Sequence, residues 1–119
     1  MIKILNKYEL EFIEFLNNKN FTDKECRLTI LQGYDCIATS NDEVGFAVYK
    51  VGYKIIMLPT EVININGSTE DDIKNMLIES LAHEYKHFLQ DINNQDFDEA
   101  EAEQFATNMV NEYKNKSKE

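Results

Sequence analysis

The sequence predicts an α+β fold in which helices flank a short group of strands. Apolar residues recur every three to four positions near both ends of the chain, whereas β-branched and aromatic residues gather in short runs over residues 34–59. With 119 residues, of which 43% are hydrophobic and 29% charged, the chain suits one globular domain with one modest core. No repeat or linker divides it, so we expect a single domain over residues 1–119, with a frayed tail from about residue 114.

The first expected element is a helix within residues 5–18, LNKYELEFIEFLNN. Asn6 can cap this helix, with Glu9 at the third helical position. The apolar residues that share one face are Tyr8, Phe12, Phe15 and Leu16. Residues 21–33, FTDKECRLTILQG, are ambiguous because they combine a capping-box pattern with the alternation typical of a strand.

Three β-rich runs follow, YDCIAT at 34–39, VGFAVYK at 44–50 and YKIIMLP at 53–59. The turn signals SND and VG separate them. The simplest arrangement is a small antiparallel meander, and we expect Pro59 to close its last strand because proline cannot donate a backbone hydrogen bond.

Two further helices are expected after a connection over residues 60–68. The first is capped by Ser68 or Thr69, has an acidic first turn and continues to about Gln90. The polar segment DINNQD breaks the pattern, and a last helix is expected from about Phe97 to Tyr113. Its apolar face comprises Ala102, Phe105, Ala106, Met109, Val110 and Tyr113.

Charge and composition exclude several classes of protein. The net charge is −10, which argues against a nucleic-acid binder because phosphate neutralisation supplies most non-specific affinity. No run approaches the roughly 20 apolar residues of a membrane span, and the N-terminal residues lack the apolar region of a signal peptide. We therefore expect a cytoplasmic protein without a membrane or nucleic-acid partner. Cys26 and Cys36 form no CxxC motif and are expected to be buried, reduced thiols.

Both histidines lie in the stretch HEYKH, residues 83–87. His83 and His87 are four residues apart, so on a helix both rings can face one metal ion, and zinc accepts imidazole nitrogen. Zinc lowers the pKa of a bound water to about 7, and Glu84 lies where a carboxylate can take its proton. A chance HExxH in so short a chain has a probability on the order of one in several hundred. The alternative is two exposed histidines on a polar helix face.

A catalytic zinc site usually has three protein ligands, and the chain has no third histidine. Glu101 interrupts the border of the apolar face of the last helix, where a carboxylate is costly unless it is paired or binds a metal. We therefore expect Glu101 to be the third ligand, with Asp98 as the main alternative. Glu99 and Glu103 lie in more polar directions and indicate an exposed acidic face.

HEYKH, followed by EAEQFA at 101–106, resembles the HExxH…E-A-(D/N/E)-x-F-A pattern of small gluzincin-like metallopeptidases, nearest to the ImmA/IrrE type. The resemblance implies a minimal zincin-like fold with Glu84 as the catalytic base. The zinc ligands that it implies are His83, His87 and Glu101. Glu103 then takes a position where the family often has an Asp or Asn that supports a ligand from outside the coordination sphere.

The resemblance covers about residues 44–110, and the chain departs from the pattern within it. Lys86 stands where a small residue often precedes the second histidine, and the gap of fourteen residues from His87 to Glu101 is short. No helix-turn-helix accompanies the motif.

The expected activity is zinc-dependent hydrolysis of a peptide or protein substrate, which an exposed strand over residues 53–58 could bind by β-augmentation. Residues that could polarise the oxyanion are Tyr49, Tyr53, Tyr113 and Arg27, although each suits a structural role. Two alternatives stay open. One is a deformylase-like hydrolase with Cys36 as third ligand, and the other is a metal-stabilised binding or regulatory module without turnover.

Overall fold

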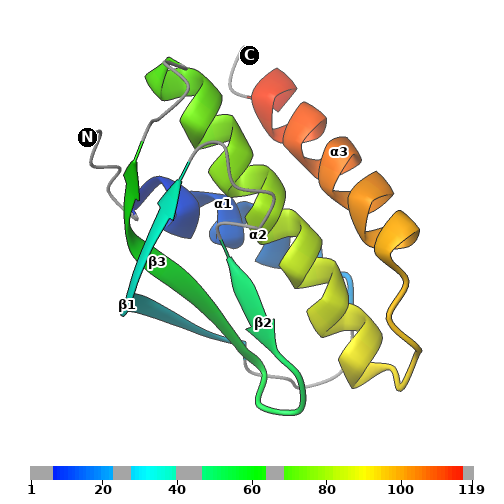
Figure 1. Ribbon diagram of the computed structural model, residues 1–119. Helices are drawn as coiled ribbons and strands as arrows, with labels where there is room; N and C mark the ends of the chain where they lie inside the picture. Colours follow the sequence, from blue (N-terminus) through cyan, green and yellow to red (C-terminus); the bar gives the residue numbers. More distant parts are fainter. Residues whose placement is uncertain (1–6, 23–27, 40–46, 64–68, 117–119) are drawn as a thin grey trace.

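The computed structural model describes residues 7–22, 28–39, 47–63 and 69–116 of the chain. Within these ranges the fold is α+β, as predicted, with three helices and a three-stranded sheet (Figure 1). In chain order the elements are α1 (Lys7–Asn17), β1 (Thr29–Thr39), β2 (Val48–Lys50), β3 (Ile55–Ile63), α2 (Glu70–Ile92) and α3 (Glu99–Lys116).

The sheet is mixed, so the predicted antiparallel meander is wrong. Its strand order is β1-β3-β2, with β1 parallel to β3 and β2 antiparallel to β3. The turn that joins β2 and β3 was identified correctly, since Gly52 and Lys54 both adopt positive φ in it. A turn signal predicts only which consecutive strands are joined by a tight turn. The pairing of Thr29 with Ile55 depends on long-range contacts, which an apolar run does not encode.

Pro59 lies inside β3 rather than at its end, which corrects the second expectation about the sheet. The strand continues to Ile63, so the connection to α2 is shorter than predicted. Pro59 pairs with Tyr34 between two register shifts of β1, where the regular ladder is already interrupted. A missing backbone N–H is tolerated at such an irregularity.

α2 begins where the sequence predicted. Of the two candidate caps, Thr69 takes the position, and Ser68 lies outside the described residues. Thr69 Oγ1 accepts a hydrogen bond from the Asp72 N–H at 3.1 Å, and the Asp72 carboxylate accepts one from the Thr69 N–H at 3.4 Å. The helix runs two residues past Gln90, to Ile92.

α3 is shifted towards the C-terminus relative to its predicted bounds. Asp98 caps it, because its Oδ1 accepts a hydrogen bond from the Glu101 N–H at 3.0 Å. Phe97 therefore precedes the helix, and Glu99 is its first residue. The helix continues to Lys116, so the first residues of the predicted frayed tail are helical.

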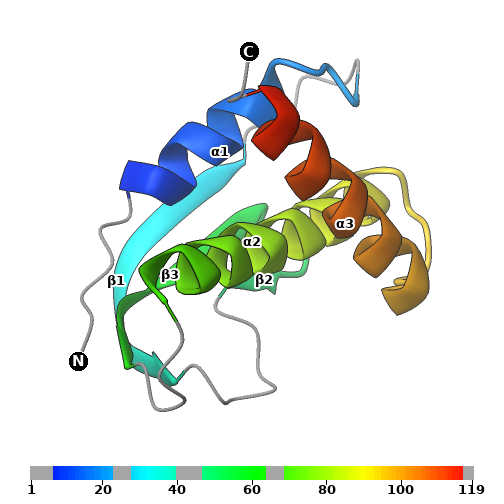
Figure 2. The same cartoon turned by 90° about the horizontal axis from the view of Figure 1, so that it is seen from above.

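The core is centred on α2, which contacts α1 and α3 as well as β2 and β3 (Figure 2). The largest fully buried apolar side chains are Phe12, Leu16, Ile56, Leu58, Leu77, Ile78 and Leu81. The predicted apolar face of α3 is confirmed, with Ala102, Ala106 and Val110 buried. Among the residues that the structure describes, no helix is both long and apolar enough to cross a membrane. Predictions for Asn6, Cys26 and Arg27, and for the side chains of Tyr8 and Cys36, lie outside the described residues.

Candidate metal centre

The two histidines of α2 face each other, as their spacing predicts. His83 Nε2 and His87 Nε2 are 3.1 Å apart, and the rings meet almost edge to face, at 78°. Two nitrogen ligands of one tetrahedral zinc ion lie about 3.3 Å apart when each bond is about 2.0–2.1 Å long. The two imidazoles are therefore already close to the separation that a shared ion requires.

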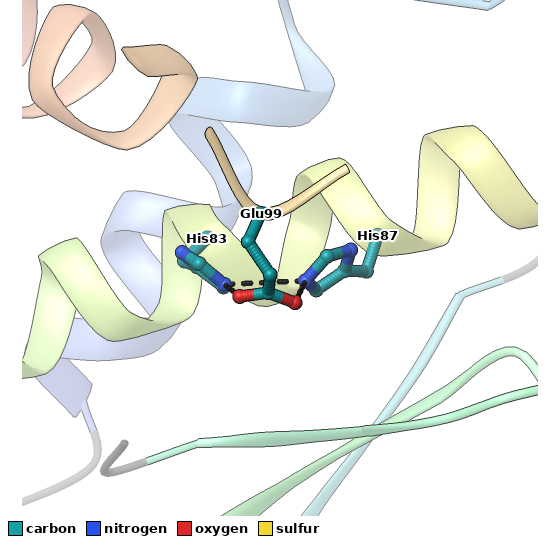
Figure 3. A group of neighbouring side chains, drawn as sticks. All are labelled: His83, His87 and Glu99. Atoms are coloured by element: carbon teal, nitrogen blue, oxygen red, sulfur yellow. Dashed lines mark hydrogen bonds and ion pairs between the residues drawn. The ribbon is translucent and has the colours of Figure 1, made fainter. Parts of the chain in front are cut away.

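Glu99 completes the group from the first turn of α3. Its Oε2 lies 2.9 Å from His83 Nε2, and its Oε1 lies 2.8 Å from His87 Nε2 (Figure 3). One ligand atom from each of these three residues lies within 4.8 Å of the others, so the group could hold a metal ion. The sequence indicated an exposed acidic residue at this position. The side chain is indeed exposed, yet its carboxylate points at both rings.

Glu101, the third ligand expected from the sequence, is not brought to the histidines. Its Oε1 lies 3.3 Å from Lys86 Nζ and accepts a hydrogen bond from Gln90 Nε2, also at 3.3 Å. The Lys86 ammonium also lies 5.5 Å from the centre of the Phe105 ring. A carboxylate at the border of an apolar face is costly unless it is paired or bound to metal, and the structure pairs Glu101 with Lys86.

The other two acidic residues considered from the sequence have different positions. Asp98 caps α3 through its side chain, and its backbone carbonyl accepts hydrogen bonds from Ala102 N–H and Gln90 Nε2. Glu103 is exposed on α3 and does not belong to the group of three ligands. The cap at Asp98 is the signal that could have identified Glu99, because it makes Glu99 the first residue of the helix.

Gln90 supports the buried ring of His87, a contact that the sequence analysis missed. Its Oε1 lies 2.8 Å from His87 Nδ1 and also accepts a hydrogen bond from the Asp98 N–H at 3.4 Å. Its Nε2 donates to the Asp98 carbonyl at 3.3 Å. Rotating the amide by 180° would set donor against donor and acceptor against acceptor, so this orientation is fixed. His87 Nδ1 therefore carries a proton, and neutral His87 has its lone pair on Nε2.

The position of the His87 proton on Nδ1 indicates whether the site suits a cation. The lone pair of neutral His87 Nε2 faces Glu99 Oε1 at 2.8 Å, and a lone pair and a carboxylate oxygen repel at that distance. A positive charge between them removes the repulsion, whether it is a proton or a metal ion. Two imidazoles and a carboxylate form a donor set that zinc accepts. The residues present thus fit a divalent metal.

Glu84 lies beside the group but turns towards the sheet. Its Oε2 accepts a hydrogen bond from the Tyr49 N–H of β2 at 2.9 Å. Burial raises the pKa of Glu84 above the ordinary glutamate value; the Tyr49 N–H and the nearby histidines only partly oppose this, and Glu99 adds to it. A carboxyl group with a raised pKa exchanges its proton closer to neutral pH than an exposed glutamate does.

The strand proposed from the sequence to bind a substrate is β3, the central strand of the sheet. Its residues Ile55–Met57 are paired on both sides, with β1 and with β2, so a peptide could not add there without displacing a strand. On β2, the Tyr49 N–H donates to Glu84, and just before the strand the Ala47 N–H donates to Ser80 Oγ at 3.0 Å. These two amides fasten the β2 segment to α2.

Of the three tyrosines considered as oxyanion donors, Tyr49 and Tyr113 make structural contacts. The Tyr49 hydroxyl donates to Asp91 Oδ2 at 2.7 Å. Tyr113 packs edge to face against Phe12, with ring centres 5.1 Å apart. Tyr53 lies exposed in the turn between β2 and β3.

Phe97 forms an apolar surface at the border of the candidate centre. Its ring stacks on His87, with centroids 4.5 Å apart and an interplanar angle of 19°, and it also approaches Tyr49. It is 43% exposed, so the ring also meets solvent. The sequence had assigned Phe97 to the start of a helix and gave no indication of this contact.

Comparisons with protein-family models, with curated proteins and with solved structures found no match to this chain. The resemblance of HEYKH and EAEQFA to gluzincin-like metallopeptidases therefore stays a prediction. The function of the chain is inferred from the positions of His83, His87, Glu99 and Glu84.

Proposed function

We propose that the protein is a zinc-dependent metallopeptidase that hydrolyses a peptide bond in a peptide or protein substrate. The observation that carries this proposal is the convergence of His83 Nε2, His87 Nε2 and the Glu99 carboxylate beside the half-buried Glu84. Three protein ligands of this kind leave one position of a tetrahedral ion open, as in catalytic rather than structural zinc sites. The exposed side chain of Glu99 leaves this side of the group accessible to solvent.

In this proposal each residue has one role. Bound zinc would supply a water of low pKa and would polarise the substrate carbonyl. Glu84 takes the proton of the attacking water and passes it to the leaving amine, for which its raised pKa is suited. The Tyr49 N–H restrains the Glu84 carboxylate during this exchange. His83 and His87 would bind the zinc ion through Nε2, and the Glu99 carboxylate would partly neutralise the positive charge of the ion.

A second function, a metal-stabilised binding module without turnover, is favoured by one observation. Glu84 accepts the Tyr49 N–H, so it links α2 to β2 whether or not any chemistry occurs. The presence of a glutamate between the two histidines is then explained by its structural contact alone.

Replacement of Glu84 by glutamine distinguishes the two functions. Glu84→Gln keeps an oxygen that can accept the Tyr49 N–H but cannot take a proton, and Glu79→Gln, on the exposed side of α2, is the matched control. We expect both variants to retain zinc by elemental analysis. In a digest of a peptide library, Glu84→Gln should cleave about 10²–10⁴-fold more slowly than wild type, and Glu79→Gln should match wild type.

Three other outcomes are informative. If Glu84→Gln cleaves as fast as wild type, Glu84 is not the general base. If no form cleaves any peptide while all bind zinc, the binding module is correct. If wild-type protein retains no zinc, both functions are wrong.

A further inference from the structure

Gln90 is a buried polar residue whose amide has no role in the proposed chemistry. It lies on α2 one turn beyond His87, and only 1% of its surface is exposed. A buried amide is costly unless its donors and acceptors are paired. Gln90 has all of these pairings, and they join two parts of the candidate centre.

The contacts of Gln90 extend in two directions. Towards α2, its Oε1 faces His87 Nδ1 at 2.8 Å. Towards α3, it accepts the Asp98 N–H and donates to the Asp98 carbonyl, so both backbone groups of one residue are held. Its own backbone carbonyl accepts the Gln95 N–H at 2.9 Å. The segment between α2 and α3 is thus closed onto Gln90 by its side chain and its main chain.

Asp98 immediately precedes Glu99, and this adjacency makes the contact relevant to the metal ligands. The backbone of Asp98 sets where α3 begins, and therefore the point from which the Glu99 side chain reaches the histidines. The same amide oxygen keeps a proton on His87 Nδ1 and leaves Nε2 free to bind. One side chain therefore controls two of the three ligands.

We propose that Gln90 is the positioning residue of the metal centre, fixing the tautomer of His87 and holding Asp98 so that Glu99 reaches both imidazoles. This inference rests on the proposed zinc site and names the residue that assembles it. Hydrogen-bond partners of metal-bound histidines typically change metal affinity by about 10–100-fold when they are removed. The loss of Gln90 should have an effect of this size, although Gln90 does not touch the ion.

The test compares three variants of the full chain. Gln90→Met keeps length but removes both polar groups, and Gln90→Glu keeps an oxygen facing His87 but loses the amide donor. Gln104→Met makes the same change at an exposed glutamine of α3 and is the control. Two properties are measured. The first is the tautomer of His87, by nitrogen-15 NMR of metal-free protein at a pH where the spectra show a neutral imidazole, and the second is zinc affinity, by chelator competition.

We expect His87 to carry its proton on Nδ1 in wild type, in Gln104→Met and in Gln90→Glu. In Gln90→Met the proton should move towards Nε2, and zinc should bind about 10–100-fold more weakly. Gln90→Glu should bind zinc more tightly than Gln90→Met because it restores the acceptor. If Gln90→Met does not fold, Gln90→Asn, which withdraws the oxygen from His87, replaces it with the same expected changes.

The inference is overturned if Gln90→Met keeps both the wild-type tautomer and a zinc affinity within about twofold of wild type. Equal losses in Gln90→Met and Gln104→Met would also contradict it. The tautomer is measured without metal, so it reports on Gln90 even if wild-type protein binds no zinc. That result would refute the proposed function separately.

Discussion

The Lys86 ammonium lies 3.3 Å from the Glu101 carboxylate. Lys86, which directly precedes His87, therefore neutralises the acidic residue that the sequence predicted as a metal ligand. Glu99 is left to face the histidines. Lys86 is also the position at which the chain departs from the metallopeptidase pattern, and its pairing with Glu101 gives that departure a structural reason.

One zinc ion per chain is expected, and it should stabilise the fold. A ligand that binds only the folded state adds about 2.7 kcal/mol to the free energy of unfolding at a free concentration 100 times its Kd. Elemental analysis gives the stoichiometry, and urea unfolding with zinc and with chelator gives the stabilisation. His83→Ala should abolish the difference. Wild-type protein without retained metal and with equal stability in chelator would refute the site.

Glu99→Ala should weaken zinc binding far more than Glu101→Ala or Glu103→Ala, since only Glu99 contacts both histidines. Glu101→Ala removes one hydrogen bond from Gln90 and should cost no more than the roughly 10–100-fold typical of supporting residues. Glu103→Ala should be neutral. The measurement is chelator competition on all three variants. A larger loss at Glu101 than at Glu99 would restore the assignment made from the sequence.

Glu9 should make the fold less stable as pH rises. Its side chain is 1% exposed, and its Oε2 has no hydrogen-bond partner among the described residues. Burial raises the pKa of Glu9 from 4.5 to about 8. Between these values the folded state holds a proton on Glu9 that the unfolded chain has lost. The contribution of Glu9 to the free energy of unfolding is therefore most favourable below about pH 4.5 and falls as pH rises towards 8.

At pH 8 this loss has an upper limit of about 4 kcal/mol, and Glu9→Gln should remove it. Urea unfolding at about pH 5 and pH 8 measures the difference between wild type and variant. Glu14→Gln, an exposed position on the same helix, controls for the change of charge. Parallel pH profiles of wild type and Glu9→Gln would show that Glu9 is ionised in the folded protein.

Asp91 should stabilise the turn between β2 and β3. Its Oδ2 accepts hydrogen bonds from the Tyr49 hydroxyl at 2.7 Å and from the Gly52 N–H at 2.9 Å. Hydrogen bonds to charged groups contribute about 1.5–3 kcal/mol, and partial exposure places these near the low end, so Asp91→Ala should cost roughly 2 kcal/mol of the free energy of unfolding.

Urea unfolding again provides the measurement, with Asp96→Ala in the exposed segment after α2 as the control. Tyr49→Phe removes only the hydroxyl bond and should cost less than Asp91→Ala. Equal costs for these two variants would mean that the bond to Gly52 contributes nothing.

The parts of the fold that the sequence predicted are those set by neighbouring residues. The cap of α2 at Thr69 and the shared face of His83 and His87 depend on residues within one helix. The parallel pairing of β1 with β3 depends on contacts across the whole chain, and periodicity gives only the faces of a strand.

Glu99 rather than Glu101 faces the histidines for a geometric reason. Glu101 was chosen because of its angle to the apolar face of its helix, and Glu99 differs from it by about 200° around the axis. At the first residue of a helix the side chain can reach beyond the helix end, so position along the axis matters more than angle. That position is set by the N-cap at Asp98, which is a local signal, and by the contact of Asp98 with Gln90, which no local pattern indicates.

The proposed metal ligands and the proposed general base, Glu84, are held in place by different parts of the chain. His83, His87 and Glu99 belong to one helical hairpin closed by a short loop, whose closure costs little entropy. Glu84 is restrained by Tyr49, 35 residues away, in a strand of only three residues at the border of the sheet. Local opening of β2 would therefore release the base while the hairpin kept its ion. Metal content and turnover would then report on two separate cooperative units, so destabilising β2 would lower turnover more than zinc content.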